Sequence, residues 1–345
     1  MHSSFLDKLC TGIWKKAEDL QHEKLKSLAE ALPYVIQSSL APSTLGKYRA
    51  AWRDWLSWSN KYDIHPCPAE PFMVALYASD ICQTKSSQGA LSAAWNGIRW
   101  GHTTAGLASP TEDPFVKAAF EGAKRLSSRA PSRQKDPLEA EHIKELVKLY
   151  GASSNFLELR FLVICLLSFA GFFRISEVLA IQVKNLTFRD SFLIVFLPQS
   201  KTDQNRDGHN VYIARTGTES CPVAVLDKYL RVTSLGDSPE NYLITRMSKT
   251  RYGHKAIGNK PLSYTRVRET FLEFLKPVSI KNPDLDFGLH SLRSGGSSEA
   301  ANNDVDVELI DKHARWKNGK SRQRYIKYKP NKRLCITKSL GLLQI

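Results

Sequence analysis

Residues 160–177 of this 345-residue chain read RFLVICLLSFAGFFRISE, and this stretch indicates how the second half of the chain folds. Its uncharged part, Phe161 to Phe173, is thirteen residues long, whereas a membrane-spanning helix needs about 20 apolar residues. The stretch is therefore predicted to belong to a buried helix that runs from Phe156 to Phe173. Gly171 marks a break, and a second helix is expected from Arg174 to Ala180.

The arginine that follows this apolar stretch needs a physical explanation, because a buried guanidinium without a partner is costly. Arg174 and Glu177 are three residues apart and so lie on one helical face, where a simple ion pair is one interpretation. The other is that Arg174 holds an external anion while Glu177 fixes its orientation. The planar guanidinium suits a two-pronged grip on phosphate oxygens, so the second interpretation is preferred.

Around this stretch, the sequence predicts a domain that is mainly α-helical with a small antiparallel β-sheet. Residues 191–197 and 209–214 are rich in β-branched and aromatic side chains and flank a polar, glycine-containing segment, which is typical of a β-hairpin. Helical patterns surround the hairpin, over residues 139–150, 223–230, 264–275, 292–301, 307–313 and 320–328.

The first 128 residues predict a separate helical domain. A leading helix, or a partly ordered arm, is expected to end near Pro33, and four helices follow, which begin near Pro42, Phe72, Ser87 and Phe115. Tryptophans at positions 52, 55 and 58 share the first of these four helices. They are interpreted as core residues rather than as a platform for stacking DNA bases. The chain is thus divided into an arm (1–29), a helical domain (30–128), a basic linker (129–136) and a second domain (137–345).

The charge of the chain predicts a polyanionic partner. The formal net charge is +15, and residues 312–345 contain eleven lysines and arginines and no acidic residue. A solvated surface would also explain such a run, but binding to nucleic acid is preferred, because neutralised phosphates release counterions. The six cysteines have no metal-ligand spacing, so a reduced compartment and no metal site are expected.

Further side chains suited to phosphate chemistry follow along the chain. Lys201 lies at the predicted tip of the hairpin, which alone carries little information. His290 and Arg293 are three residues apart, so one helix would direct both toward the same point. Gly295 and Gly296 come next, and such small residues allow a bulky group, for example DNA, to approach the backbone. An indole N–H at Trp316 and a phenol nine residues later, at Tyr325, complete the set.

The order of these residues resembles that of the tyrosine site-specific recombinases, the family of phage integrases and of Xer-type and Cre-type enzymes. The resemblance covers nearly the whole chain, with residues 30–128 similar to the family's core-binding domain and residues 137–345 similar to its catalytic domain. The wording RISEVL, QSKTDQ and RWKN…RYI is most similar to recombinases of eukaryotic mobile elements, such as Crypton and DIRS-like transposons.

The resemblance implies an enzyme that cleaves and rejoins duplex DNA without metal, cofactor or ATP. Tyr325 would attack the scissile phosphate and form a 3′-phosphotyrosine intermediate. Arg174 and Arg293 would bind the non-bridging oxygens, and Lys201 would be the general acid. His290 and Trp316 would donate hydrogen bonds to the phosphate, and Glu177 would support the arginines.

Two of these positions have a competitor in the sequence. His313 is the alternative to Trp316, and Tyr328 is the alternative to Tyr325. In both cases the family's nine-residue interval between the hydrogen-bond donor and the nucleophile favours Trp316 with Tyr325. The glycine that often precedes this donor in the family is replaced here by Arg315.

The resemblance also implies partners and a location. Four protomers would assemble on duplex DNA, with no membrane or small-molecule ligand involved. The apolar tail, Leu334 to Ile345, would either dock on a neighbouring protomer or fold back on its own domain. The nucleus is the expected location for a eukaryotic mobile element, and the cytoplasm otherwise. A catalytically silent domesticated DNA-binding protein and a type IB topoisomerase-like enzyme are the alternative functions; the filled catalytic positions and the recombinase-like helical domain argue against them.

Overall fold

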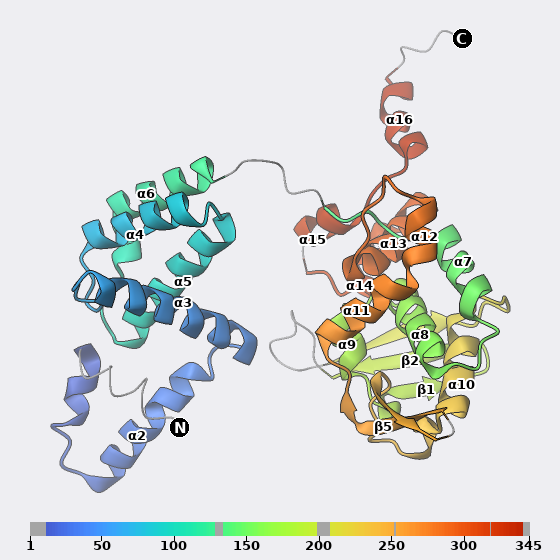
Figure 1. Cartoon of the computed structure of the whole chain (residues 1–345), viewed down its shortest axis with the longest axis horizontal. Helices are drawn as coiled ribbons and strands as arrows, with labels where there is room; N and C mark the ends of the chain where they lie inside the picture. The colour runs from blue at the N-terminus through green and yellow to red at the C-terminus, as the bar shows by residue number, and fades with distance from the viewer. Residues whose placement is uncertain (1–11, 128–133, 199–207, 252, 318, 341–345) are drawn as a thin grey trace. The chain divides into compact units, whose positions relative to one another are not determined.

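The structure is a computed structural model that describes residues 12–127, 134–198, 208–251, 253–317 and 319–340. The chain divides into two compact units, residues 1–132 and 133–345 (Figure 1). Both units are mainly helical and the second contains small antiparallel sheets, so the predicted fold class is confirmed. No helix in the described ranges is long and apolar enough to cross a membrane.

The first unit is built from helices around an aromatic core. Trp55 is fully buried and Trp52 nearly so, and both belong to one buried cluster with Tyr77 and Phe120, against which the partly buried Trp58 packs. Their interpretation as core residues is therefore confirmed. The elements are η1 (Gly12–Ala17), α2 (Glu23–Gln37), α3 (Pro42–Lys61), α4 (Pro71–Thr84), α5 (Gln88–Thr104), η2 (Pro110–Glu112) and α6 (Pro114–Leu126).

Prolines begin three of these α-helices. Pro42, Pro71 and Pro114 lie at the first turn of α3, α4 and α6, where a backbone N–H has no helical partner to bind. The prediction that the leading helix ends near Pro33 is wrong. α2 continues through this buried proline to Gln37, because burial of the ring offsets the missing hydrogen bond.

The second unit contains a three-stranded antiparallel sheet, in the order β1 (Leu186–Phe188), β2 (Phe192–Leu197) and β3 (His209–Ala214). Phe192 pairs with Ala214 and Leu197 pairs with His209, which confirms the predicted hairpin. A further antiparallel pair, β4 (Thr245–Thr250) and β5 (Gly253–Pro261), was not predicted, because its sequence is polar and basic and lacks the apolar alternation of a typical strand.

Helix α8 is the centre of the second unit. It is buried from Leu159 to Ser168 and packs against α7, α10, α11 and α13. The helices of this unit are α7 (Ala140–Tyr150), α8 (Phe156–Ala170), α9 (Ile175–Ala180), η3 (Val183–Asn185), α10 (Pro222–Thr233), η4 (Leu235–Asp237), α11 (Tyr264–Phe274), α12 (Lys276–Lys281), α13 (Leu289–Asn302), α14 (Val307–Ala314), α15 (Gly319–Tyr325) and α16 (Pro330–Lys338).

Two of the predicted helix ends that differ from the structure lie at functionally important positions. α8 ends at Ala170 rather than at Phe173, because Gly171 caps it and Phe172 adopts a left-handed conformation with φ 47°. α15 ends at Tyr325 rather than at Tyr328. α16 projects from the rest of the unit, and none of its described residues is buried (Figure 1).

Candidate active site

The turn between α8 and α9 places Arg174 at the N-cap of α9. The backbone N–H of Arg174 donates to one oxygen of Glu177 at 2.8 Å, and its Nη1 donates to the other at 2.7 Å. The pair is therefore a helix cap as well as an ion pair, and it uses both carboxylate oxygens. The Arg174 side chain keeps 15% of its surface exposed, which leaves part of the guanidinium accessible.

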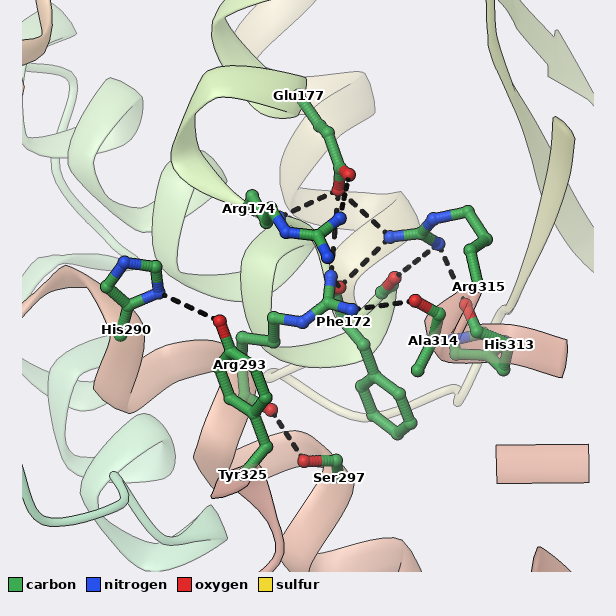
Figure 2. Close-up of polar contacts among 11 residues, drawn as sticks. Phe172, Arg174, Glu177, His290, Arg293, Ser297, His313, Ala314, Arg315 and Tyr325 are labelled. Carbon is green, nitrogen blue, oxygen red and sulfur yellow. Dashed lines mark hydrogen bonds and ion pairs between the residues drawn. The ribbon is translucent and has the colours of Figure 1, made fainter. Parts of the chain in front are cut away.

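Two further arginines converge on the same carboxylate. Nη2 of Arg315 lies 3.0 Å from Oε2 of Glu177, and Nη1 of Arg293 lies 3.7 Å from it. Figure 2 shows Arg174 and Arg315 approaching Glu177 from opposite sides, with Arg293 near both. We call these four side chains the guanidinium cluster. The side chains of Glu177, Arg293 and Arg315 are at most 4% exposed, so the cluster is almost dry.

Burial and charge act against each other on these groups. Burial raises the pKa of Glu177, but the neighbouring cations and donors bring this pKa below its usual value. The largest of these contributions comes from Arg315, followed by the Arg174 backbone N–H, Arg293 and the Arg174 side chain. Burial lowers the pKa of Arg293, and the neighbouring Arg174 cation lowers it further. The cluster thus carries three cations and one anion, and this excess positive charge suits a bound anion.

Backbone carbonyl groups fix the orientation of the two buried arginines. Arg293 donates through Nη1 to the Phe172 carbonyl and through Nη2 to the Ala314 carbonyl, the latter at 2.7 Å. Arg315 donates to the carbonyl groups of Phe172 and Gly171 at 3.0 and 3.3 Å. The Nε atom of Arg293 is buried and has no hydrogen-bond partner within the described part of the chain.

Tyr325 lies against this cluster. Its hydroxyl is 3.4 Å from Nδ1 of His290, and the Arg293 Cζ lies 5.2 Å from its ring centroid (Figure 2). The Trp316 ring stacks on the Tyr325 ring at 5.7 Å with an angle of 22° between the planes. The Trp316 indole Nε1 is buried and, among the described residues, lacks a hydrogen-bond partner.

Side chains of α13 hold the backbone that follows Tyr325. Ser294 donates to the carbonyl of Tyr325. Ser298 accepts from the N–H of Lys327 at 2.8 Å, and Asn302 donates to the Lys327 carbonyl at 3.1 Å. Asn302 also accepts from the Lys329 N–H at 2.9 Å. These polar residues, at every fourth position of α13, bind the extended segment as a neighbouring strand would, which explains why α15 ends at Tyr325.

Gly295 and Gly296 serve helix packing. A Cβ atom on Gly295 would lie 1.8 Å from the Leu138 carbonyl oxygen, and one on Gly296 would lie 2.0 Å from the Phe169 carbonyl oxygen. The predicted close approach to these glycines is therefore made by backbone of the same chain rather than by DNA. They allow the backbone of α13 to pack against α8 and the start of the second unit.

The structure brings together six of the seven predicted site residues: Arg174, Glu177, His290, Arg293, Trp316 and Tyr325. Lys201 lies outside the described residues. Of the two competitors, His313 contacts the Ala170 carbonyl at 2.8 Å and packs on Phe172 rather than on Tyr325. Tyr328 is 48% exposed.

Arg315 is the site residue that the sequence pattern did not reveal. In the sequence, Arg315 is noticeable only because it replaces the family's glycine. This replacement alone does not indicate a role for the arginine. A signal was present, because an arginine immediately before Trp316, in a position that favours glycine, needs a compensating interaction. Its partner, Glu177, is 138 residues away, so sequence spacing does not reveal the contact.

Comparisons with known proteins identify the family of this chain. The chain matches the model of the phage integrase family over residues 138–332. It is 30% identical over 296 residues to an integrase/recombinase xerD homolog of Selenomonas ruminantium, and the alignment covers 84% of this chain and 83% of that protein.

Solved structures share the fold. XerH site-specific recombinase in a post-cleavage complex with a palindromic difH substrate has a TM-score of 0.60 at 10% identity, and the match covers 97% of this chain and 94% of XerH. The Tn1549 transposon integrase, residues 82–397, has a TM-score of 0.50 at 11% identity, with coverage of 95% and 99%. The family match and the bacterial relative establish that this chain belongs to the phage integrase family and is a site-specific recombinase that acts on DNA.

Proposed function

We propose that Tyr325 is the nucleophile of the recombinase and that Arg174 and Arg293 bind the scissile phosphate. The observation that carries this proposal is the position of the Tyr325 ring, which lies beside Arg293 while its hydroxyl faces His290. A phenol among fixed cations is placed to attack a phosphodiester.

Strand cleavage then proceeds as an exchange of one phosphodiester for another. The Tyr325 oxygen bonds to phosphorus, and the bond between phosphorus and the 5′-oxygen breaks. The phenol proton passes to Nδ1 of His290, which faces the hydroxyl, and the leaving 5′-oxygen gains a proton, which we assign to Lys201 as general acid. The product is a 3′-phosphotyrosine and a free 5′-hydroxyl. The 5′-hydroxyl of a second strand reverses these steps, so no ATP is consumed.

The guanidinium cluster supplies the electrostatic part of this mechanism. Arg174 is partly accessible, and Arg293 is held by two carbonyl groups, so both are oriented before DNA arrives. Positive charge that is already in place stabilises the pentavalent transition state without reorganisation. Glu177 supports both arginines.

Hydrogen-bond donors near Tyr325 complete the site. The buried Trp316 Nε1, which has no partner among the described residues, is assigned to a non-bridging phosphate oxygen. His290 is assigned to the same phosphate, because it is an exposed residue in the first turn of α13 and faces the nucleophile.

The domain roles and the assembly belong to the same proposal. Residues 30–128 form the core-binding domain, residues 129–136 the basic linker and residues 137–345 the catalytic domain. Both domains contact duplex DNA, and four protomers exchange strands between two duplexes. The net charge of +15 supports the DNA contact. Cross-linking on DNA that yields monomers or dimers alone would contradict the tetramer.

We further propose that the chain derives from a eukaryotic mobile element and works in the nucleus. The wording RISEVL, QSKTDQ and RWKN…RYI supports this origin. The bacterial relative does not support it, and a bacterial host would place the enzyme in the cytoplasm. The genomic flanks test this assignment: split or inverted repeats, or a neighbouring reverse transcriptase gene, are expected, and a bacterial chromosomal context would overturn it.

The central test is capture of the covalent intermediate. Binding sites are selected from a pool of random duplexes, and each is nicked beside the cleavage position so that the released 5′-hydroxyl fragment diffuses away. A covalent adduct is expected with the intact chain and not with Tyr325→Phe, while Tyr328→Phe still forms it. Specific binding without an adduct would indicate a domesticated DNA-binding protein. Relaxation of supercoiled DNA without strand exchange between duplexes would indicate a topoisomerase-like enzyme.

A further inference from the structure

Arg315 occupies a backbone position that is unfavourable for an arginine. It caps the end of α14 in the left-handed conformation, with φ 58°. Glycine adopts this conformation at little cost, whereas a residue with a Cβ atom does so less readily. Its Nη1 and Nη2 atoms make four hydrogen bonds, all to acceptors of the protein itself, so contact with DNA does not account for it. The reason for an arginine here lies inside the protein.

The contacts of Arg315 join segments that are far apart in the sequence. It donates to the Phe172 carbonyl at 3.0 Å and to the Glu177 carboxylate at 3.0 Å. Both acceptors are shared with Arg293, which binds the Phe172 carbonyl and lies 3.7 Å from Glu177. A bond of 2.8 Å to the His313 carbonyl and a position over the Phe173 ring complete its surroundings.

Arg315 is therefore a link between the two phosphate-binding arginines. The α8–α9 turn carries Arg174, and α13 carries Arg293. Arg315 comes from a third element, the end of α14. It contacts the α8–α9 turn and also the Glu177 carboxylate, which Arg174 and Arg293 approach as well. A buried carboxylate is costly unless cations and donors compensate it, and Arg315 is its second close ion-pair partner, after Arg174.

We propose that Arg315 is a positioning residue for strand cleavage, which fixes the Glu177 carboxylate so that Glu177 orients Arg174 and Arg293 toward the scissile phosphate. This inference rests on the proposed function of these two arginines. Arg315 itself does not touch the substrate. Its loss is expected to affect the rate of cleavage and its dependence on pH, and to leave the affinity for DNA unchanged.

The expected pH dependence follows from Glu177. The groups that face it are Arg174 from its own helix cap, Arg293 from α13 and Arg315 from the end of α14. Arg315 contributes most to lowering the pKa of Glu177, against burial. A carboxylate with a lowered pKa loses its contribution as the pH falls through that pKa. Without Arg315 the pKa rises, so the acid side of the cleavage profile moves to higher pH.

His313 is the other titratable group at this end of α14. Burial lowers its pKa, and the Arg315 and Arg293 cations lower it further. Removal of Arg315 therefore changes the titration of this histidine as well. A variant that also carries His313→Gln distinguishes Glu177 from His313 as the cause of the shifted pH profile. The shift is expected to persist in this variant if Glu177 causes it.

Two substitutions test the role of the guanidinium. Arg315→Gly keeps the left-handed backbone without strain and removes the cation. We expect cleavage to slow on the order of tenfold to a hundredfold, as is typical for a residue that orients a direct ligand. Arg315→Lys restores a cation beside Glu177 but not the forked contacts with the carbonyl groups. In this variant, the acid side of the pH profile is expected to lie close to its position in the unmodified chain, and the cleavage rate is expected to recover in part.

Arg160 provides a matched control. It is also a buried arginine of the second unit, 3% exposed, and its Nη1 donates to the Thr245 carbonyl at 2.9 Å. This acceptor belongs to β4, which contributes no residue to the guanidinium cluster. Arg160→Lys is expected to lower thermal stability as Arg315→Lys does, and to leave the pH profile of cleavage where it is.

The experiment measures single-turnover adduct formation by the full chain on the nicked duplex, at several pH values, with DNA affinity and thermal unfolding measured in parallel. A missing adduct in the unmodified chain, or an adduct with Tyr325→Phe, overturns the proposed function. An active chain whose Arg315→Gly variant keeps the same rate and the same acid limb overturns this inference alone. A slower variant with an unshifted profile, matched by Arg160→Lys, shows a purely structural role and also overturns it. If Arg315→Gly does not fold, Arg315→Lys decides by the same criteria.

Discussion

The guanidinium cluster and the basic segment of residues 317–338 carry the same sign of charge in opposite environments. The cluster is almost fully buried, and each of its cations has fixed partners. The basic segment contains nine lysines and arginines and no acidic residue, and many of its side chains are exposed. Buried charge is oriented before the substrate binds, whereas exposed charge is screened by salt. The cluster should therefore control rate, and the segment should control affinity.

The largest effect is expected from the partly exposed member of the cluster. Arg174→Ala removes a charge that is held in place by Glu177, and the rate of adduct formation should fall on the order of 10²–10³. Affinity for DNA, measured by fluorescence anisotropy, should change far less. A variant that loses affinity and rate to the same extent would show that the cluster and the segment do not differ in function.

A smaller loss is expected when the backbone of the nucleophile is released. Ser298→Ala with Asn302→Ala removes the hydrogen bonds to Lys327 and Lys329. Each such bond contributes about 1 kcal/mol, so cleavage should slow roughly tenfold or more, with unchanged DNA affinity.

The matched control for this pair is Asn282→Ala. Asn282 also donates to a backbone carbonyl, that of Val278, at 2.9 Å, but it lies at the end of α12. It should leave the cleavage rate unaffected. An equal loss of rate in this control would mean that the polar residues of α13 act only through general stability.

The basic segment should influence affinity and leave the rate unaltered. Lys320→Gln, Arg333→Gln and Lys338→Gln remove exposed cations of α15 and α16. The slope of log K against log salt should decrease by about 0.9 for each DNA phosphate that the variant no longer neutralises. At saturating DNA, adduct formation should proceed at the original rate. Lys144→Gln with Lys148→Gln, on α7, is the control. An equal change in slope in this control would show that the basic segment contributes no more to DNA binding than other surface lysines.

The smallest effect concerns a buried group that is kept neutral. Burial lowers the pKa of His102, whose Nε2 accepts from the Ala69 N–H at 2.9 Å and whose Nδ1 lies 2.8 Å from the Ile98 carbonyl. Below about pH 6.5, the unfolded chain binds a proton that the folded chain resists, so stability should fall as the pH decreases. His102→Gln should flatten this dependence, and the exposed His65→Gln should retain it.

Tryptophan fluorescence is the suitable probe for this measurement. Six of the seven tryptophans lie in the first 128 residues, and Trp52 contacts His102 with 5.8 Å between ring centroids. An identical pH dependence in the His102→Gln variant would exclude the histidine as its cause.

Local pattern determined much of this protein. Apolar periodicity predicted most α-helices of both units, though not α12 and α16, and the β2–β3 hairpin, because burial of one face imposes a period on the sequence. The order of the polar residues identified the family. The pattern did not predict correctly where α8, α15 and the leading helix end. At these three positions, continuation of the helix competes with tertiary contacts, which a local pattern does not contain.

Tertiary structure alone decided how the site is held. α8 and α15 end where side chains from elsewhere bind their backbone groups: Arg293 and Arg315 after α8, and the polar face of α13 after Tyr325. The sequence indicated that Arg174 and Glu177 interact, but not that Arg315 shares the carboxylate. Helical and strand periods act over a few residues, whereas this contact spans 138, and its energy comes from the exclusion of water from charges that only the folded chain brings together.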